Sequence, residues 1–258
     1  MLFLILVILI SYAPLIWKSI KSIFASVYLV YYKKYVGREA ILLYHDGGGL
    51  FMSGMIATDT YNKIRTILDS LGGKAVDLIL HTPGGEIFAT MLLSKLLKSY
   101  PDLRVVVPRY AMSGGTLLAL SCNRLVMGNH AVLGPIDPQI GGIFSGSFNA
   151  RVWKRISKVK KDKIKDENVG LGIVADQYDK SITKYIHGLL KGRVAGNKLS
   201  EFVEMLVSGE VEHSYQFDAA FLSKYLSVES LDAKASRYLY KVLDAGPGSE
   251  VLTTATIR

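Results

Sequence analysis

Two glycine pairs, each between an apolar run and an amphipathic segment, constrain the fold of this chain more than any other feature. The first lies in HTPGGE at residues 81–86 and the second in AMSGGT at residues 111–116. Each follows a predicted strand and precedes a predicted helix, which places both at the sheet edge where α/β proteins bind ligands. Consecutive glycines allow tight turns and leave backbone amides uncovered. The two turns are therefore either structural or the halves of one site.

Short apolar strands alternate with amphipathic helices from residue 40 onward. Strands are predicted at 40–45, 76–81, 104–108 and 124–128, and helices near 58–71, 87–99 and 113–122. This order predicts an α/β sheet with right-handed crossovers. A segment at 134–147 has the composition of a loop. Helical patterns follow near 172–191, 198–207, 216–226 and 231–243.

The positive charge of the chain is concentrated in two segments. The 258 residues have a formal net charge of +9, but residues 1–38 hold five Lys/Arg and no acid, and residues 151–165 hold eight with one acid. The remainder is slightly acidic, which argues against a nucleic-acid partner. The basic run at 151–165 is either a solvated loop or a patch for anionic lipid head groups.

The N-terminal stretch from Met1 to Trp17 contains no charged side chain. A spanning helix needs about 17–25 residues, so we expect an uncleaved single-pass anchor, with a cleaved signal peptide or a buried helix as alternatives. Residues 22–32 are rich in Tyr and too short to span again, which favours a helix in the membrane interface. Because basic residues follow the apolar run, the positive-inside rule predicts that the downstream domain lies in the cytoplasm. With one cysteine, Cys122, no intrachain disulfide can form.

These observations predict three parts: a membrane anchor with its juxtamembrane segment at 1–38, one domain at 39–245, and a loose tail at 246–258. No P-loop or dinucleotide-binding motif is present, and the five histidines are scattered without metal-ligand spacing. We therefore expect no cofactor, no metal and no dependence on ATP in this chain.

Ser113 combines a nucleophilic hydroxyl with a predicted helix N-terminus. The amide of Gly114 and the dipole of that helix favour negative charge beside the hydroxyl. The glycines at 84 and 85 add amides on the facing turn, so a nucleophile and two oxyanion donors are predicted at one place. The alternative is that Ser113 only caps the helix, as serines at such positions often do.

The segments VDLILHTPGGEIFATMLLSKLLKSY and VVVPRYAMSGGTLLALSCNRLVMGNHAVLGPIDPQ resemble the membrane-bound Clp-type serine proteases of the serine dehydrogenase proteinase family. These are relatives of signal peptide peptidase A in the Clp/crotonase superfamily. The resemblance is strong over residues 40–140 and weaker at 172–182 and 206–215. It implies a Clp/crotonase-like α/β spiral of stacked strand–helix turns with C-terminal helices. It also implies Ser113 as nucleophile, an oxyanion hole at Gly84, Gly85 and Gly114, and a homo-oligomer.

The sequence offers several candidates for the residue that takes the proton from Ser113. Clp proteases have a histidine further along the chain, at a spacing from the serine where this chain has Pro138, and His130 reads as a surface turn residue. A Ser-His-Asp triad is therefore not supported by the sequence. In the stretch 209–218, where relatives have a THDYP-like motif, this chain keeps His213 and Tyr215.

Relatives of signal peptide peptidase A use a Ser-Lys dyad, in which a buried lysine loses its proton. Lys180 matches the lysine of a family helix start, and Lys154 follows Ser113 at a separation that is also plausible for such a dyad. Lys158, Lys165 or no lysine at all complete the alternatives.

The sequence thus predicts a membrane-anchored serine endopeptidase that acts on proteins or peptides, with membrane lipid as a further partner. One alternative is a crotonase-type acyl-CoA enzyme, for which Glu86 is the acidic residue beside the hole. The other is a scaffold or partner-binding protein that keeps the fold but lacks a working base.

Overall fold

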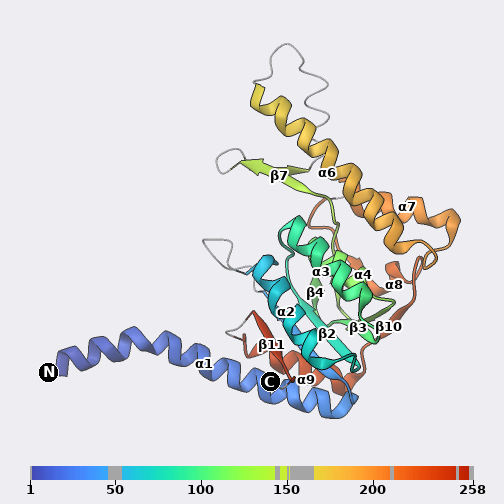
Figure 1. The fold of residues 1–258 in the computed structure, drawn as a ribbon. Coiled ribbons are helices and arrows are strands. Elements are labelled where there is room, and N and C mark those ends of the chain that lie inside the picture. The colour runs from blue at the N-terminus through green and yellow to red at the C-terminus, as the bar shows by residue number, and fades with distance from the viewer. Residues whose placement is uncertain are drawn as a thin grey trace.

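The computed structural model describes residues 2–45, 54–142, 146–149, 151, 166–209, 212–247 and 250–255. Within these ranges the chain forms a mixed α/β fold around a six-stranded sheet of order β10-β5-β3-β2-β1-β11 (Figure 1). Its strands are β1 (Glu39–Tyr44), β2 (Val76–His81), β3 (Leu103–Val107), β5 (Arg124–Met127), β10 (Val228–Ser230) and β11 (Val251–Thr253). All neighbours run parallel except β11, which pairs antiparallel with β1.

Helices cover both faces of this sheet. The helices are α1 (Leu2–Val36), α2 (Thr58–Leu71), α3 (Ile87–Ser99), α4 (Gly114–Leu120), α6 (Asp166–Leu190), α7 (Gly196–Val207), α8 (Ala219–Leu222) and α9 (Ala233–Asp244). Side chains alternate along β1: Ile41 and Leu43 lie in the cluster formed with α2, α3 and α4, whereas Leu42 lies in the cluster formed with α1 and α9. Burial on both faces explains why the strands are almost wholly apolar.

Two smaller sheets extend the domain. β4 (Tyr110–Ala111), β6 (Val132–Leu133) and β9 (Phe217–Asp218) form a three-stranded sheet, and β7 (Gln139–Gly142) pairs with β8 (Gly146–Asn149) as a hairpin. The long helix α6 packs on α7 and α4, and its beginning extends away from the main sheet (Figure 1).

Most predicted elements agree with the structure. The strand at 76–81 and the helices at 58–71 and 87–99 have the predicted bounds. Two segments within the predicted domain at 39–245 differ. The loop predicted at 134–147 contains β7 and the beginning of β8, and the helix predicted at 216–226 is replaced by β9 and one helical turn. That turn begins where Asp218 accepts a hydrogen bond from Phe221 N–H. Phe217 pairs with Leu133 of β6, so the chain is a strand at this residue and not part of a helix.

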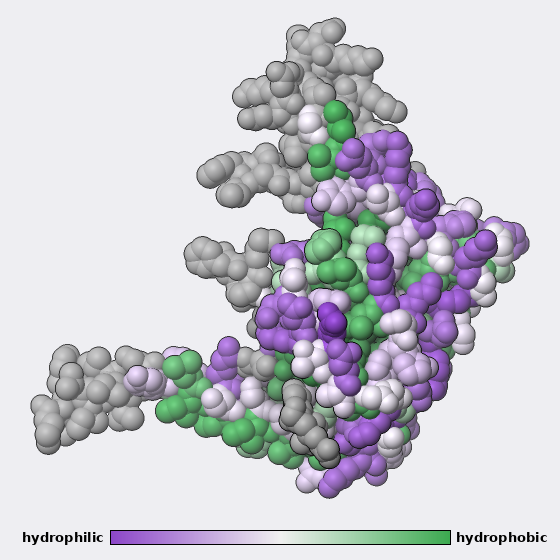
Figure 2. All heavy atoms as spheres, viewed as in Figure 1, coloured by the Kyte–Doolittle hydropathy of each residue, from purple (hydrophilic) through white to green (hydrophobic). Residues whose placement is uncertain are grey.

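The N-terminal region is one continuous helix. The sequence predicted an anchor followed by a separate helix at 22–32, but α1 runs from Leu2 to Val36, about 50 Å at 1.5 Å per residue. Tyr12–Val36, with a mean hydropathy of 1.2, is long and apolar enough to cross a membrane. Ala25, Leu29 and Tyr32 share one face and are buried against α9 and the sheet. Apolar side chains are exposed elsewhere on α1, among them Ile16, Trp17, Ile20, Ile23, Phe24 and Val27. Green, hydrophobic atoms follow much of this helix in Figure 2.

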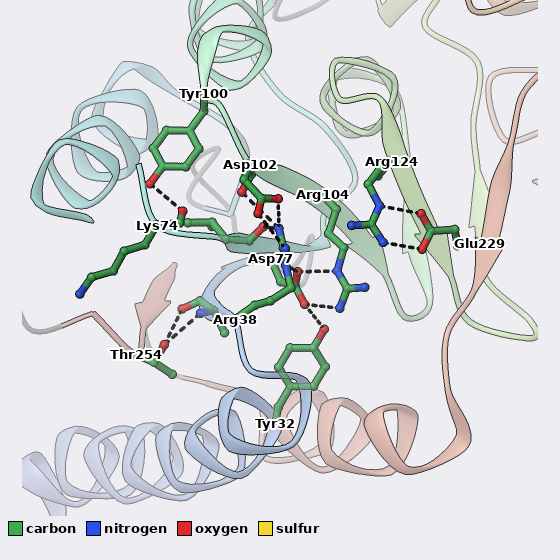
Figure 3. A network of polar contacts seen from close by, with 12 residues as sticks. Tyr32, Arg38, Lys74, Asp77, Tyr100, Asp102, Arg104, Arg124, Glu229 and Thr254 are labelled. Atoms are coloured by element: carbon green, nitrogen blue, oxygen red, sulfur yellow. Dashed lines mark hydrogen bonds and ion pairs between the residues drawn. The ribbon is translucent and has the colours of Figure 1, made fainter. Parts of the chain in front are cut away.

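A buried carboxylate joins α1 to the sheet (Figure 3). Asp77, the second residue of β2, is fully buried and accepts a 2.6 Å hydrogen bond from Tyr32 Oη. It also accepts from Arg38 Nε at 2.7 Å and from Arg104 Nε and Nη2 at 2.5 and 2.8 Å. Arg38 also binds Asp102 at 2.7 Å. Hydrogen bonding to Asp77 raises the pKa of Arg104. These hydrogen bonds offset the free-energy cost of burying the charge of Asp77. The cluster lies where β1, β2 and β3 begin.

The C-terminal residues do not form the predicted loose tail. The register places Leu252 opposite Leu42 of β1, so β11 closes one edge of the sheet. Glu250, just before β11, binds His45 Nε2 at 3.0 Å, Lys63 Nζ at 3.2 Å and the hydroxyl of Thr60. Burial raises the pKa of Glu250, but the hydrogen bonds from Thr60, His45 and Lys63 outweigh it and the net pKa is lowered.

We expect Asp77→Ala to lower the free energy of unfolding by about 3–5 kcal/mol, because two arginines lose a buried partner. The matched control is Glu229→Gln. Glu229 pairs with Arg124 with both side chains about half exposed, and such a pair is worth less than about 1 kcal/mol. Urea unfolding of both variants in detergent checks the difference. Equal losses would show that the buried cluster contributes no more than a surface ion pair.

We expect Glu250→Gln to lower the free energy of unfolding at pH 7 by about 1 kcal/mol, since charge-assisted hydrogen bonds are lost. The folded pKa of Glu250 is lowered, so its stabilisation is present above the ordinary pKa of about 4.3 and is lost as the pH falls through the lower, folded value. The gap between wild type and variant should therefore close on acidification. Glu201→Gln is the control, at an exposed position of α7 where the carboxylate accepts one hydrogen bond, from Tyr225. A gap that is constant from pH 7 to pH 3 for Glu250→Gln would contradict the assignment.

Candidate active site

The two glycine turns lie against each other beyond the carboxyl ends of β2 and β4. Thr82, which follows β2, forms a bridge with β4, and Met112 N–H donates to Thr82 O at 2.9 Å. A β-carbon placed on Gly84 would lie 2.8 Å from Ser113 Cβ. Gly84 has a φ of +119°, which glycine alone adopts readily. The two motifs that the sequence predicted to share one sheet edge are thus in contact.

Ser113 has an unusual backbone conformation. Its φ of 50° and ψ of −118° make it the one residue other than glycine with a positive φ in the part of the chain that the structure describes. Such a conformation costs about 1–3 kcal/mol and is found mostly at functional sites. Ser113 occupies the N-cap position of α4, yet its side chain makes no capping hydrogen bond. The backbone therefore makes a sharp turn at Ser113 between β4 and α4.

The peptide bond between Gly84 and Gly85 has a fixed orientation. Ile56 N–H donates to Gly84 O at 2.8 Å, and Glu86 N–H donates to Ile56 O at 2.8 Å. In a trans peptide the carbonyl and the following N–H point in opposite directions. Because Gly84 O points to Ile56, Gly85 N–H points the other way. A side chain at Gly85 would collide with the backbone of Ile56.

Gly114 contributes a second amide to the same space. It is the first residue of α4, so its N–H has no partner within the helix. A β-carbon on Gly114 would lie 3.4 Å from Gly85 N. Among the described residues, neither amide makes a hydrogen bond. Two unpaired donors therefore lie close together beside Ser113.

These groups line a groove of about 630 Å³. Its wall includes Ser113, Gly85, Gly114 and Glu86. The remaining lining is mostly apolar and comes from several elements, including Ile56, Ile87, Phe88, Leu117, Ile136, Tyr178 and Ile182. A groove with an apolar wall and a few convergent polar groups is typical of a substrate site.

A histidine–aspartate pair adjoins the groove, which the sequence did not predict. His213 lines the groove with Ser113, and its Nδ1 lies 2.6 Å from Oδ1 of Asp137. Asp137 is buried, and Gln139 Nε2 donates to its Oδ2 at 2.5 Å. An aspartate at Nδ1 fixes the imidazole so that Nε2 is the nitrogen available for proton transfer.

The sequence contains weak signals for this pair. His213 stands in the stretch that matches the family's THDYP-like motif, and Asp137 lies in GPIDPQ. They are 76 residues apart, and only the return of the chain through β9, beside β6, brings these two regions together. His130, the histidine nearest in sequence, is exposed in a turn, as expected.

Of the two lysines predicted as candidate bases, the structure describes Lys180. Lys180 is 71% exposed, and its Nζ lies 2.5 Å from Asp176. Hydrogen bonding to Asp176 raises the pKa of Lys180. Its helix neighbours Tyr178 and Ile182 line the groove, whereas Lys180 lies on another surface of α6.

Lys154 lies outside the described residues, as do Lys158, Lys165 and most of the basic run at 151–165. Arg151 is the described member of that run. It binds Asp179 at 2.9 Å and also pairs with Glu204.

Hydrogen bonds that involve Thr82 and His45 hold the first glycine turn, HTPGGE, in place. Gly84 N–H donates to Thr82 Oγ1 at 3.1 Å, and Thr82 Oγ1 lies 2.9 Å from Nδ1 of the buried His45. Nε2 of His45 lies 3.0 Å from Glu250. The strand β11 is therefore linked through His45 and Thr82 to the turn that carries Gly85. Among the described residues no group of three or more His, Cys, Asp or Glu side chains is placed to hold a metal ion.

Comparison with known proteins places the chain in a protease family. Residues 2–247 match the family model described as ClpP-like SDH-type serine proteinase. Two uncharacterized proteins of Methanocaldococcus jannaschii are 36% identical over 158 residues and 32% identical over 190 residues, which is 61% and 73% of this chain. The matches span 54% and 63% of the two relatives' own lengths. The chloroplastic serine protease SPPA of Arabidopsis thaliana is 25% identical over 81% of this chain and 29% of its own.

Solved structures agree on the fold. A mutant of the 1510-N membrane-bound stomatin-specific protease has a TM-score of 0.50 at 16% identity, covering 72% of this chain and 79% of its own. A second mutant, in complex with a substrate peptide, has a TM-score of 0.50 at 17% identity, covering 70% and 73%. The family model spans nearly the whole chain, and the chain therefore belongs to the ClpP-like SDH-type serine proteinase family.

Proposed function

We propose that this chain is a membrane-anchored serine endopeptidase that works without ATP, with Ser113 as its nucleophile. The observation that carries the proposal is the arrangement around Ser113. The hydroxyl of a strained serine, without a capping bond, shares a groove with the two unpaired amides of Gly85 and Gly114. Membership of a serine proteinase family supports the same reaction.

The arrangement suits acyl transfer. Ser113 Oγ attacks the peptide carbonyl as its proton passes to a base, and the electron pair of the C=O bond moves to the oxygen. The amides of Gly85 and Gly114 donate to that oxyanion. The C–N bond then breaks, and the base returns the proton to the leaving amine. Water repeats the sequence on the acyl-enzyme and releases the second product.

His213, held by Asp137, is the base that the described residues favour. It lines the groove with Ser113, and the 2.6 Å contact of its Nδ1 with buried Asp137 leaves Nε2 for the serine proton. The imidazolium that forms would be stabilised by the carboxylate.

A Ser-Lys dyad with Lys154 is the second candidate mechanism. In the two 1510-N structures, one mutation replaces a serine and the other replaces a lysine with alanine. The sequence separation of those two positions equals the separation of Ser113 and Lys154 in this chain. Lys180, the other predicted partner, is exposed and has a raised pKa. A lysine base needs burial and a lowered pKa, so Lys154 is the better supported of the two.

The predicted alternatives have less support. For an acyl-CoA enzyme, Glu86 lines the groove, but nothing in that reaction needs the strained serine. A scaffold without catalysis would need no unpaired amides beside a serine. The scaffold alternative applies only if the chain lacks a working catalytic base.

We expect Ser113→Ala to reduce hydrolysis of fluorogenic casein at least about a thousandfold and to abolish labelling by an alkyl fluorophosphonate. His213→Gln and Asp137→Asn should each reduce kcat about a hundredfold or more, since general base catalysis contributes about 10²–10⁴. Lys154→Met should then retain activity, and Lys180→Met is the matched lysine control.

The opposite pattern would reverse the assignment. If Lys154→Met loses activity while His213→Gln keeps it, the Ser-Lys dyad is correct. If Ser113→Ala hydrolyses casein at the wild-type rate, the proposed function is wrong.

We also propose that α1 anchors the protein with the catalytic domain in the cytoplasm, as a homo-oligomer. The uncharged run from Met1 to Trp17 and the apolar character of α1 support the anchor, and the basic residues after the apolar run support the orientation. The substrates are then peptides or proteins, including membrane proteins, that reach the groove from the cytoplasmic side. Anionic lipid near the basic run at 151–165 is a further proposed partner.

We expect the full chain to stay in the membrane fraction after alkaline carbonate extraction and a chain lacking residues 2–20 to be released. The deletion keeps Ala25, Leu29 and Tyr32, the side chains of α1 that pack on the domain, so the truncated domain should remain folded by circular dichroism. Quantitative extraction of the full chain by carbonate would contradict a spanning anchor. Retention of the truncated chain would assign membrane binding to another surface.

A further inference from the structure

Thr90 carries a buried hydroxyl without a hydrogen-bond partner next to the proposed oxyanion site. The residue lies in the first part of α3 and is 1% exposed. Its Oγ1 has no hydrogen-bond partner among the described residues. Threonines in helices usually bond the carbonyl one turn back, and here Glu86 O accepts only the N–H of Thr90, at 2.9 Å. The unpaired hydroxyl therefore needs an explanation.

The hydroxyl faces the space beside Gly114. A β-carbon placed on Gly114 would lie 2.7 Å from Thr90 Oγ1 and 3.4 Å from Gly85 N. That constructed point is one covalent bond from Gly114 Cα, so Thr90 Oγ1 and Gly85 N both lie next to the backbone of Gly114. Two amides and one hydroxyl thus lie close together in the wall of the groove. Thr90, Gly85, Ser113 and Gly114 all line this groove.

A side chain at 114 would collide with Thr90 Oγ1. Glycine avoids that collision, and the three neighbouring groups can all donate hydrogen bonds. Such a site is suited to an oxygen with developing negative charge, because preorganised donors stabilise it without reorganisation. An apolar atom there would leave the Thr90 hydroxyl unsatisfied.

We propose that Thr90 Oγ1–H is a third hydrogen-bond donor to the oxyanion, beside the amides of Gly85 and Gly114. This rests on the proposed peptidase function, because the oxyanion exists only if Ser113 attacks a carbonyl. The hydroxyl is unpaired in the free protein and is satisfied when the tetrahedral intermediate forms. The interaction therefore acts on the transition state more than on substrate binding.

The test is Thr90→Val in the full chain, which removes the hydroxyl and keeps the shape and the branched β-carbon. With fluorogenic casein we expect kcat to fall about a hundredfold, the loss typical of one oxyanion donor, while KM changes less than about twofold. The rate of labelling by an alkyl fluorophosphonate, which also forms an oxyanion, should fall in parallel. Thr90→Ser keeps a hydroxyl and should restore most of both rates.

Thr183→Val is the matched control. Thr183 also has a buried hydroxyl without a partner among the described residues, but it lies on α6 away from the groove. Both valine variants should have a Tm equal to or above that of the wild type, because a methyl group replaces an unpaired hydroxyl. Only Thr90→Val should lose activity. A purely structural role for Thr90 would lower the Tm and would not separate the two variants in this way.

Three outcomes decide the proposal. If Thr90→Val hydrolyses casein at the wild-type rate while Ser113→Ala is inactive, the assignment of Thr90 is wrong and the peptidase stands. If Thr90→Val loses activity and Thr90→Ser does not recover it, packing rather than the hydroxyl is responsible, and the assignment is again wrong. If the wild type itself shows neither labelling nor hydrolysis that depends on Ser113, the proposed function and this inference both fail.

Discussion

The buried carboxylate of Asp77 joins the apolar helix α1 to the sheet that carries the candidate site. It accepts hydrogen bonds from Tyr32 on α1, from Arg38 in the turn before β1 and from Arg104 on β3 (Figure 3). A charge at this depth is tolerated only while its partners stay in place. The apolar helix is therefore attached to the sheet, and it cannot move away without breaking the hydrogen bond from Tyr32 and exposing the carboxylate to solvent.

This attachment also fixes where the groove lies relative to the proposed anchor. Asp77 stands at the beginning of β2, and Thr82 follows its end, a separation of about 16 Å along a strand. The glycine turns and the groove therefore lie at the opposite end of β2 from the contact between Asp77 and Tyr32 of α1. A second link, from Glu250 through His45 and Thr82 to Gly84, reaches the site from the C-terminal strand. The site is thus held by residues from both ends of the chain.

The sequence predicted local features well and distant ones poorly, for physical reasons. The helix at 87–99 and the strand at 76–81 follow from periodicity and apolar runs, which depend on neighbours in the chain. The sequence did not predict that Val251–Thr253 pairs with β1, because so short a strand cannot show an alternating hydrophobic pattern. The separation of the glycine turns indicated Ser113 and its donors, but the contact of His213 with Asp137 depends on a long return of the chain. The unpaired hydroxyl of Thr90 is a property of packing alone.

The two candidate bases are not equivalent in the electrostatic environment of the groove. A lysine acts as a base only when its ammonium form is disfavoured, and a nearby carboxylate favours that form. Asp137 is buried close to the groove and is already hydrogen-bonded to His213 and Gln139. Its negative charge would oppose deprotonation of a lysine brought to Ser113, whereas it would stabilise the imidazolium that His213 would become on accepting the serine proton. A lysine base would therefore need protection from Asp137. For a histidine base, the same carboxylate is part of the mechanism.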